Sequence, residues 1–237
     1  MAGIAVAADS WRPGPGGGRR VLAVGTPARL NRAWRRAGWQ VDRHALDLGP
    51  AADLAGRPFT PPVKAWPHPD AAYDAVVIHD QLAHVVDDEA AIAEAARVLR
   101  PGGRLLLRVP RDGPLAWLDS YNLYRYLRDF TKRGASLSET RGIGWRRHYP
   151  RHDLVRLLGA QFRVTAMATE GAGFTDIARL IPLIVFRWLL RWDRGVALAW
   201  PLVDLVARLD DRLGAGPFGY YVVVKAERTR VPAPGWE

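Results

Sequence analysis

Residues 73–110 read YDAVVIHDQLAHVVDDEAAIAEAARVLRPGGRLLLRVP, and this stretch decides the fold. It opens on the apolar run Ala75–Ile78, which is short enough for a strand buried on both faces. Apolar residues within Ile92–Leu99 then recur at i, i+3, i+4 and i+7, as on one face of a helix. Pro101–Gly103 ends that helix, and Arg104–Val109 supplies a second strand. The order strand, helix, strand predicts a βαβ unit.

A polar cluster of His79, Asp80, Gln81 and His84 follows the first of these strands, where a doubly wound sheet opens its ligand crevice. The whole stretch resembles the central segment of class I S-adenosylmethionine-dependent methyltransferases of type 11, whose consensus sequence is close to FDxVxxxxxLxHxxDxxxxLxExxRVLxPGGxLxxxxP. The resemblance extends over residues 20–228 and is weakest at 25–70.

The remaining chain alternates helices with apolar strands, which predicts one three-layer α/β domain over residues 19–230 after a flexible leader at 1–18. Strands are expected at Arg20–Val24, Gln40–Leu46, Phe162–Thr169 and Tyr220–Val224, and helices at Ala28–Ala37 and Arg151–Leu158. The resemblance implies a doubly wound, Rossmann-like and mostly parallel seven-stranded sheet whose last strand is antiparallel. It places a further helix and strand within residues 49–70, and lid or substrate elements at 111–149 and 174–213.

Composition narrows the function classes. The absence of Cys excludes disulfides, thiolate metal sites and Cys nucleophiles, and it fits the reducing cytoplasm. The six His residues show no metal-ligand spacing, so no metal is expected. The start of the chain lacks the basic segment and the long apolar run of a signal peptide.

The net charge of +10 is unevenly distributed. Between Arg125 and Arg156 nine basic residues stand against three acidic ones. Such a patch suits a phosphate-bearing substrate, an anionic membrane surface or nucleic acid, and a solvated surface without a ligand is an equal alternative. Nucleic acid is supported by charge alone, and we do not expect it as the partner.

The cofactor residues implied by the resemblance lie in several loops. The sequence VLAVGTPARL at 21–30 replaces the family's VLDxGxGxG, keeping Gly25 with Thr26 after it. Pro27 has no N–H to donate. Asp47, in HALDLGP, matches the acidic residue that binds the cofactor's ribose, and Trp66 stands where an aromatic could flank adenine. With His79 and Asp80, these residues would hold S-adenosylmethionine, although the acidic residue that commonly ends the third strand is absent.

Candidate chemistry centres on His148 in TRGIGWRRHYPRHDLVRLL, which resembles an element of family members that act on sugars and lipid-linked saccharides. A histidine near neutral pKa is a plausible general base, and His79 and Asp80 are further catalytic candidates. We take His84 as mostly structural. Acceptor contacts are predicted at Tyr121, Tyr124, Arg147 and Tyr149.

Residues 174–213 are apolar but interrupted by Arg179, Arg187, Arg191 and Arg194, which would form one basic stripe on a continuous helix. Three interpretations stay open: a helix lying in a membrane interface, a lid over the pocket, or a homodimer contact. The sequence thus predicts a cytoplasmic methyltransferase, peripheral to the membrane in the first case. It would O-methylate a sugar, a lipid-linked saccharide or a secondary metabolite. The alternative is a methyltransferase-like protein whose cofactor site is lost or repurposed, serving as a partner subunit or a non-methylating catalyst.

Overall fold

The computed structural model describes residues 19–46, 65–134, 145–159, 161–210 and 219–229. Its centre is one six-stranded sheet of β1 (Arg20–Val24), β2 (Gln40–His44), β3 (Tyr73–His79), β4 (Leu99–Pro110), β5 (Phe162–Glu170) and β6 (Tyr221–Arg228). The strand order is β2-β1-β3-β4-β6-β5. β2, β1, β3 and β4 pair in parallel, whereas β6 runs antiparallel to both β4 and β5. The predicted antiparallel last strand is confirmed, and the additional strand expected at 49–70 falls mostly outside the described residues.

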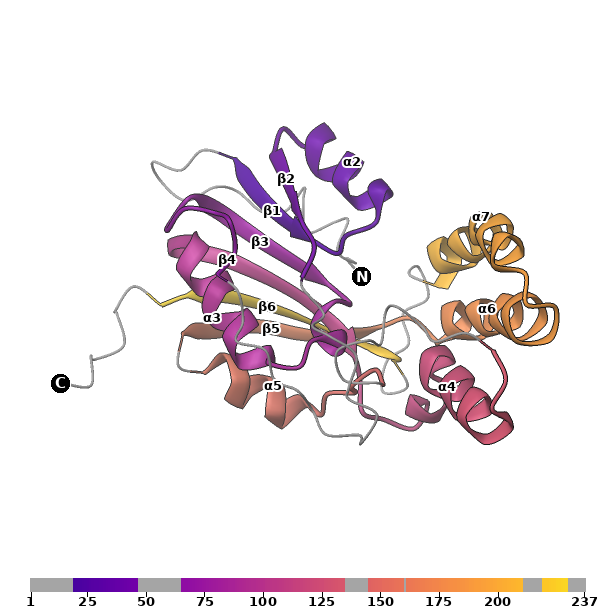
Figure 1. Cartoon of the computed structure of the whole chain (residues 1–237). Coiled ribbons are helices and arrows are strands. Elements are labelled where there is room, and N and C mark those ends of the chain that lie inside the picture. Colours follow the sequence, from indigo (N-terminus) through magenta and orange to yellow (C-terminus); the bar gives the residue numbers. More distant parts are fainter. Residues whose placement is uncertain (1–18, 47–64, 135–144, 160, 211–218, 230–237) are drawn as a thin grey trace.

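Helices cover both faces of the sheet (Figure 1). α2 (Ala28–Arg36) lies on one face, and α3 (Asp88–Val98) and α5 (Arg151–Leu158) lie on the other. Alternate residues of each strand serve the two layers: Val21 packs toward Trp34 of α2, while its neighbour Leu22 belongs to the cluster on the α3 and α5 side. The three-layer α/β sandwich and the βαβ unit predicted from residues 73–110 are confirmed.

One boundary in the βαβ unit differs from the expectation. α3 begins after Asp87, whose side chain accepts a 2.9 Å hydrogen bond from Ala90 N–H. It ends at Val98, and Leu99 already pairs with β3. Pro101–Gly103 therefore lies inside β4, where the register with β3 shifts, rather than just after the helix. Proline disfavours helical backbone in the residue before it, which accounts for the early exit from the helix.

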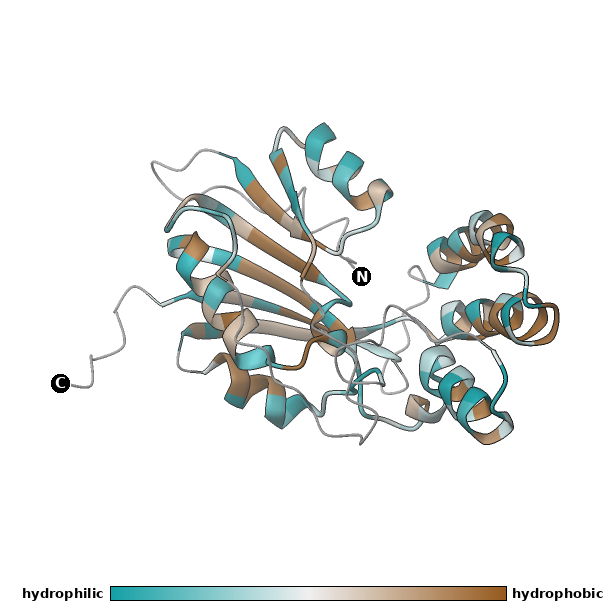
Figure 2. Ribbon diagram, in the orientation of Figure 1, coloured by the Kyte–Doolittle hydropathy of each residue, from teal (hydrophilic) through white to brown (hydrophobic). Residues whose placement is uncertain are grey.

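A separate helical layer stands beyond the carboxyl ends of the parallel strands (Figure 1), and we call it the helical cap. It consists of α4 (Ser120–Thr131), α6 (Phe174–Pro182), a π-helical segment (Leu183–Leu189) and α7 (Asp193–Asp210). A small core of its own holds the cap together, built from Tyr121, Tyr124, Leu183 and Val196. Figure 2 shows apolar residues both on the central strands and along the cap helices.

The single basic-striped helix expected across Arg179–Arg194 is wrong. Pro182 lacks the N–H that would continue α6, and the chain passes into the wider π-helical turns. Arg191 then adopts a left-handed conformation with φ 52°, the usual way of ending a helix, before α7 begins at Asp193. Arg179, Arg187 and Arg194 consequently belong to three different helical segments, with Arg191 between the last two, so the four do not form one stripe on a single helix.

Candidate functional site

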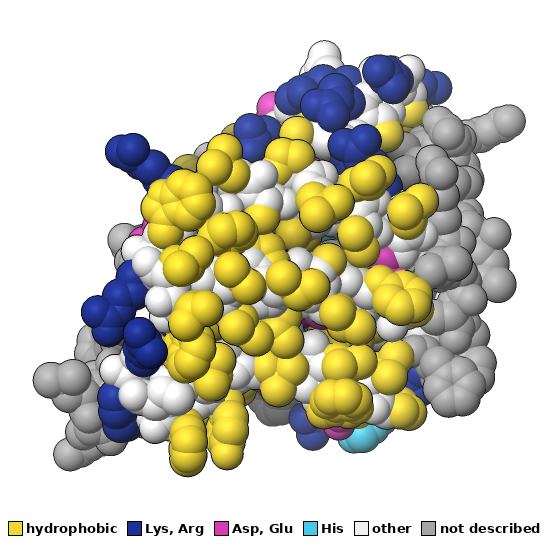
Figure 3. Space-filling view, turned by 90° about the vertical axis from the view of Figure 1, so that its right-hand side faces the viewer, with side chains coloured by type: hydrophobic (Ala, Val, Ile, Leu, Met, Phe, Trp, Pro, Cys, Tyr) yellow, Lys and Arg dark blue, Asp and Glu magenta, His cyan; other side chains and the backbone are white. Residues whose placement is uncertain are grey.

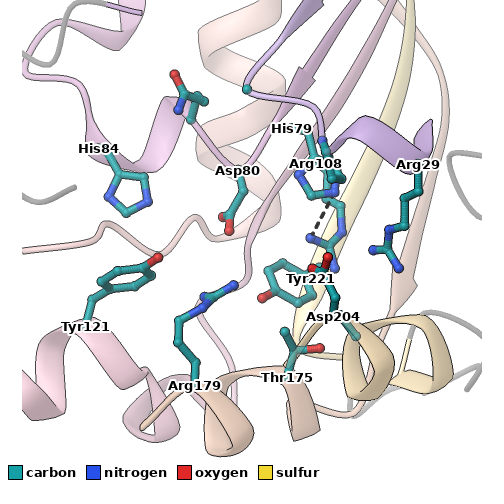
Figure 4. A pocket seen from close by; sticks show the side chains of 14 residues that line it. Arg29, His79, Asp80, His84, Arg108, Tyr121, Thr175, Arg179, Asp204 and Tyr221 are labelled. Atoms are coloured by element: carbon teal, nitrogen blue, oxygen red, sulfur yellow. Dashed lines mark hydrogen bonds between the residues drawn. The ribbon is translucent and has the colours of Figure 1, made fainter. Parts of the chain in front are cut away.

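A pocket of about 250 Å³ lies between the carboxyl ends of β1, β3 and β4 and the helical cap (Figure 4). We call it the central pocket. Gly25, His79 and Asp80 reach it from the sheet side, as the sequence predicts for a crevice at strand ends. From the cap, α4, α6 and α7 add Tyr121, Arg179 and Asp204. The pocket is therefore shared between the sheet and the cap.

Gly25 forms the turn between β1 and α2 with φ 64°, a left-handed conformation that glycine adopts without strain. A Cβ at this position would lie 1.9 Å from Cγ of Gln81, so the Gln81 side chain lies directly on the turn. Gln81 Oε1 also accepts a 3.2 Å hydrogen bond from Leu46 N–H at the end of β2. Thr26 points away from the pocket lining: it is buried, and its hydroxyl donates to Asn31 Oδ1 of α2.

His79 lies at the end of β3 beside the guanidinium of Arg108. His79 Nε2 is 3.4 Å from Arg108 Nη1, and Arg108 Nε donates a 2.8 Å hydrogen bond to Glu170. Burial and the neighbouring arginine lower the pKa of His79 to about 3. His79 is therefore neutral near pH 7 and a weak base, better suited to positioning Arg108 than to removing a proton.

Asp80 is held in an ion pair. Its backbone is left-handed with φ 61°, and both carboxylate oxygens lie 2.5 Å from Nη2 of Arg146. Burial alone would raise the pKa of Asp80, but the charge of Arg146 holds it well below the ordinary value. Asp80 thus supplies a fixed negative charge at the pocket.

Arg146 joins three carboxylates from three elements. Besides Asp80, its Nη1 lies 3.0 Å from Asp119 Oδ2 at the start of α4 and 3.2 Å from Asp176 Oδ1 in the first turn of α6. The side chain of Arg146 is fully buried. Burial opposes its charge, yet these carboxylates raise the pKa of Arg146 well above its usual value. The cluster fastens the helical cap to the end of β3, and sequence reasoning did not identify it.

His148 lies behind this cluster. Its Nε2 is 3.3 Å from Asp119 Oδ2, and its ring meets the edge of Tyr220 with centroids 6.2 Å apart. Burial would raise the pKa of Asp119, but Arg146 and His148 together lower it to about 2. His148 is not among the described residues that line the central pocket.

Of the four residues predicted to contact the acceptor, only Tyr121 lines the central pocket. Tyr124, one turn further along α4, is buried in the core of the cap. Arg147 Nη1 pairs with Asp88 at 2.7 Å, and the Tyr149 hydroxyl donates a 3.0 Å hydrogen bond to the same carboxylate. These two residues hold the loop before α5 against the start of α3.

Two predicted cofactor residues lie elsewhere. Trp66 is buried beside the ring of His44, with ring centroids 4.9 Å apart, and its backbone N–H donates to the Glu94 carboxylate. It is therefore part of the core rather than a rim aromatic. Asp47 lies outside the described residues.

Two polar side chains of the pocket have buried atoms without a hydrogen-bond partner: His84 Nδ1, and Nε and Nη1 of Arg179. Arg179 Nη1 lies 3.6 Å from Asp176 Oδ1, beyond hydrogen-bond range, and the guanidinium lies 5.1 Å from the ring centroid of Tyr121. Figure 4 shows Arg179 pointing into the pocket toward Asp80. Buried polar groups are normally satisfied, so these atoms indicate a place for a polar ligand. In the sequence, the placement of Arg179 within an apolar run was the only signal.

Comparison with known proteins bears on this site, because residues 27–107 match the family model of a methyltransferase domain. This match covers about a third of the chain and includes α2, β3 and α3. The chain is 38% identical over 101 residues to a demethylmenaquinone methyltransferase of Mycolicibacterium paratuberculosis, covering 40% of the chain and 43% of the relative. It is 37% identical over 104 residues to the enzyme of that name from Mycobacterium tuberculosis, covering 42% and 43%. The chain thus spans less than half the length of these relatives.

Solved structures of methyltransferases share only low sequence identity with this chain. One is a Burkholderia thailandensis 1,6-didemethyltoxoflavin-N1-methyltransferase with bound S-adenosylhomocysteine, at a TM-score of 0.46 and 16% identity over 89% of this chain and 71% of that one. Another is a complex of the Haloferax volcanii Trm112 methyltransferase activator with its methyltransferase partner, at 0.47 and 14% over 95% and 89%. The predicted resemblance is confirmed over residues 27–107, and the sheet itself confirms the predicted fold class.

Proposed function

We propose that this protein is an S-adenosylmethionine-dependent methyltransferase that methylates a hydroxyl group of a small-molecule acceptor. The carrying observation is that the matched segment, residues 27–107, supplies much of the sheet side of the central pocket. Its lining residues are Pro27, Arg29, His79, Asp80, Gln81 and His84. The names of the curated relatives support methyl transfer to a small molecule. A sugar, a lipid-linked saccharide or a secondary metabolite is the acceptor class we retain, and the cysteine-free composition supports a place in the cytoplasm.

The residues of the pocket fit such a cofactor in charge and shape. S-Adenosylmethionine supplies an electrophilic methyl group on a sulfonium, and it carries a carboxylate at its amino-acid end. Arg29 brings positive charge for a carboxylate, while the fixed charge of Asp80 and the ring of Tyr121 suit a cation. Gly25 leaves room for close approach once the Gln81 side chain turns aside. Asp47 remains our proposed contact for the ribose. Trp66 is buried, so we propose that it supports the site through packing in the core rather than by touching the cofactor.

We propose different roles toward the acceptor for two histidines, His148 and His84. We keep His148 as the proposed general base, with Asp119 facing its Nε2 at 3.3 Å and Nδ1 left to accept a proton. Because His148 lies behind the Arg146 cluster and does not line the central pocket, this role requires the acceptor hydroxyl to reach past that cluster. His84 lines the pocket, and burial lowers its pKa to about 4, so its ring is neutral and a weak base. Its unpartnered Nδ1 suits a hydrogen bond to the acceptor. The cap excludes water from the reaction by closing the outer side of the pocket.

A second function is favoured by a specific observation. The Gln81 side chain lies on the Gly25 turn, and Pro27 offers no N–H to a ligand there. A methyltransferase fold that uses this pocket for a different ligand, as a partner subunit or a non-methylating catalyst, would show this arrangement.

Calorimetric titration with S-adenosylmethionine and S-adenosylhomocysteine separates the two functions. The methyltransferase is expected to bind near micromolar, about −8 kcal/mol. His148→Ala should then keep that affinity while turnover on the best acceptor, followed by transfer of a labelled methyl group, falls about 10²–10⁴-fold.

The matched control is His152→Ala, because the His152 side chain is 82% exposed on α5 and does not line the pocket. It should leave both affinity and turnover unchanged. Absence of heat and of a thermal shift with either ligand would support the second function instead. Unchanged turnover in His148→Ala would move the base to another residue.

A further inference from the structure

The outer side of the helical cap is apolar. Along α7, Leu198, Leu202, Leu205 and Leu209 recur at i, i+4, i+7 and i+11, so they share one helix face. All four are at least half exposed, Leu198 reaching 72%. Ile177 and Ile181 of α6 continue the surface, and together these six residues are called the cap face. A groove of about 440 Å³ between α6 and α7, lined by apolar side chains, joins Ile177 and Ile181 to Leu209.

The same two helices line the central pocket with their other sides. α6 contributes Thr175 and Arg179 to the pocket, and α7 contributes Asp204 and Ala207. The buried stripe of α7, with Val196 and Val203, packs inward. The cap face is therefore the far side of the wall that closes the pocket, and the core of the domain does not cover it.

Basic residues outnumber acidic ones at the borders of the cap face. Arg191, Arg194 and Arg208 are exposed beside it, and Lys132 and Arg133 are exposed at the end of α4. Exposed carboxylates on the same helices are Asp193 and Asp204. Figure 3 shows this side of the molecule, with hydrophobic side chains over most of the face and basic side chains gathered along its upper and left edges.

We propose that the cap face binds the surface of an anionic lipid bilayer. An apolar helix face flanked by Arg and Trp is suited to the boundary between headgroups and acyl chains, and Trp192 is 45% exposed at the start of α7. Within the described residues no helix is long and apolar enough to cross a membrane.

Charge argues against a second copy of this chain as the occupant. Two cap faces brought together would oppose their basic residues, and like charges in contact destabilise an interface. An anionic bilayer offers apolar depth and negative charge at once. The proposal concerns the outer side of the cap, and it stands independently of what the central pocket binds.

Sedimentation of the full chain with vesicles tests the proposal. The protein should pellet at low salt with vesicles containing about one third phosphatidylglycerol in phosphatidylcholine. Less should pellet at high salt, because added salt shortens the Debye length and screens the attraction. It should remain in the supernatant with pure phosphatidylcholine. Arg191→Gln with Arg194→Gln should lower partitioning about 30-fold, at roughly 1 kcal/mol for each charge. Leu202→Ser with Leu205→Ser should lower it as well.

Matched controls lie outside the helical cap, on the helices that cover the two faces of the sheet. Arg35→Gln with Arg36→Gln, exposed on α2, and Val155→Ser, half exposed on α5, should pellet as the wild type does. Unchanged circular dichroism melting shows that the variants remain folded. Wild-type protein that stays in the supernatant at every salt concentration overturns the proposal. So does a leucine variant that still pellets, or a wild-type dimer in sedimentation equilibrium that the leucine substitutions dissociate.

Discussion

Arg146 has the greatest structural consequence of any single side chain near the pocket. Removing Arg146 would leave buried carboxylates uncompensated, which is strongly destabilising even where the intact ion pair adds little net stability. Two of its three carboxylates also accept other hydrogen bonds: Asp119 caps α4 by accepting from the backbone N–H groups of Tyr121 and Asn122, and Asp176 accepts from the Tyr221 hydroxyl. One guanidinium thus orders the start of α4, the start of α6 and the end of β3.

Gly25 carries the first prediction. Gly25→Ala should lower the free energy of unfolding by about 1–2 kcal/mol, the cost of a left-handed backbone with a side chain, and further through the clash with Gln81. Urea unfolding measures the loss. Adding Gln81→Ala should recover only the part due to the clash. Equal stability of Gly25→Ala and wild type would mean that the turn relaxes out of the left-handed region.

At the scale of elements, α7 presents an unusual feature, because Pro201 lies inside it. Proline donates no hydrogen bond, so the carbonyl of Ala197 loses its helical partner, and the ring crowds the preceding turn. Pro201→Ala should therefore stabilise the protein by about 1–3 kcal/mol, measured as a higher thermal midpoint.

Pro150→Ala is the matched comparison for this substitution. Pro150 occupies the N-cap of α5, where a missing N–H costs nothing, so its replacement should bring no comparable gain. A loss of stability in Pro201→Ala would show instead that α7 needs its proline-shaped geometry to pack on α6.

At the scale of the whole molecule, buried histidines make stability depend on pH. The folded-state pKa of His84 is about 4, below its ordinary value of 6.5, because burial disfavours the charged ring. The unfolded chain therefore takes up protons first as pH falls, and stability present above pH 6.5 is lost between about 6.5 and 4. The loss attributable to His84 is on the order of 3 kcal/mol, at 1.36 kcal/mol per pKa unit. Asp119, whose pKa is lowered to about 2, extends the loss below pH 4.

Urea unfolding at pH 7.5 and 5 measures this dependence. His84→Asn should reduce the difference between the two pH values, whereas the exposed His152→Gln should not. An identical pH dependence in His84→Asn and wild type would contradict burial of a neutral His84.

The fold and one side of the pocket could be predicted from the sequence, because both depend on local patterns. Alternation and helix periodicity determined the strands, the βαβ order and the position of His79 and Asp80 at a strand end. The cap side was decided only by tertiary structure. Arg146 meets carboxylates 66, 27 and 30 residues away, and no local spacing encodes such a meeting. Likewise Arg179 was predicted on a basic stripe. The breaks after Pro182 and at Arg191 separate α6 from the later arginines, and α6 packs so that Arg179 lines the pocket. Periodicity reports that a helix has two faces; which of them meets the sheet is set by the packing of the whole chain.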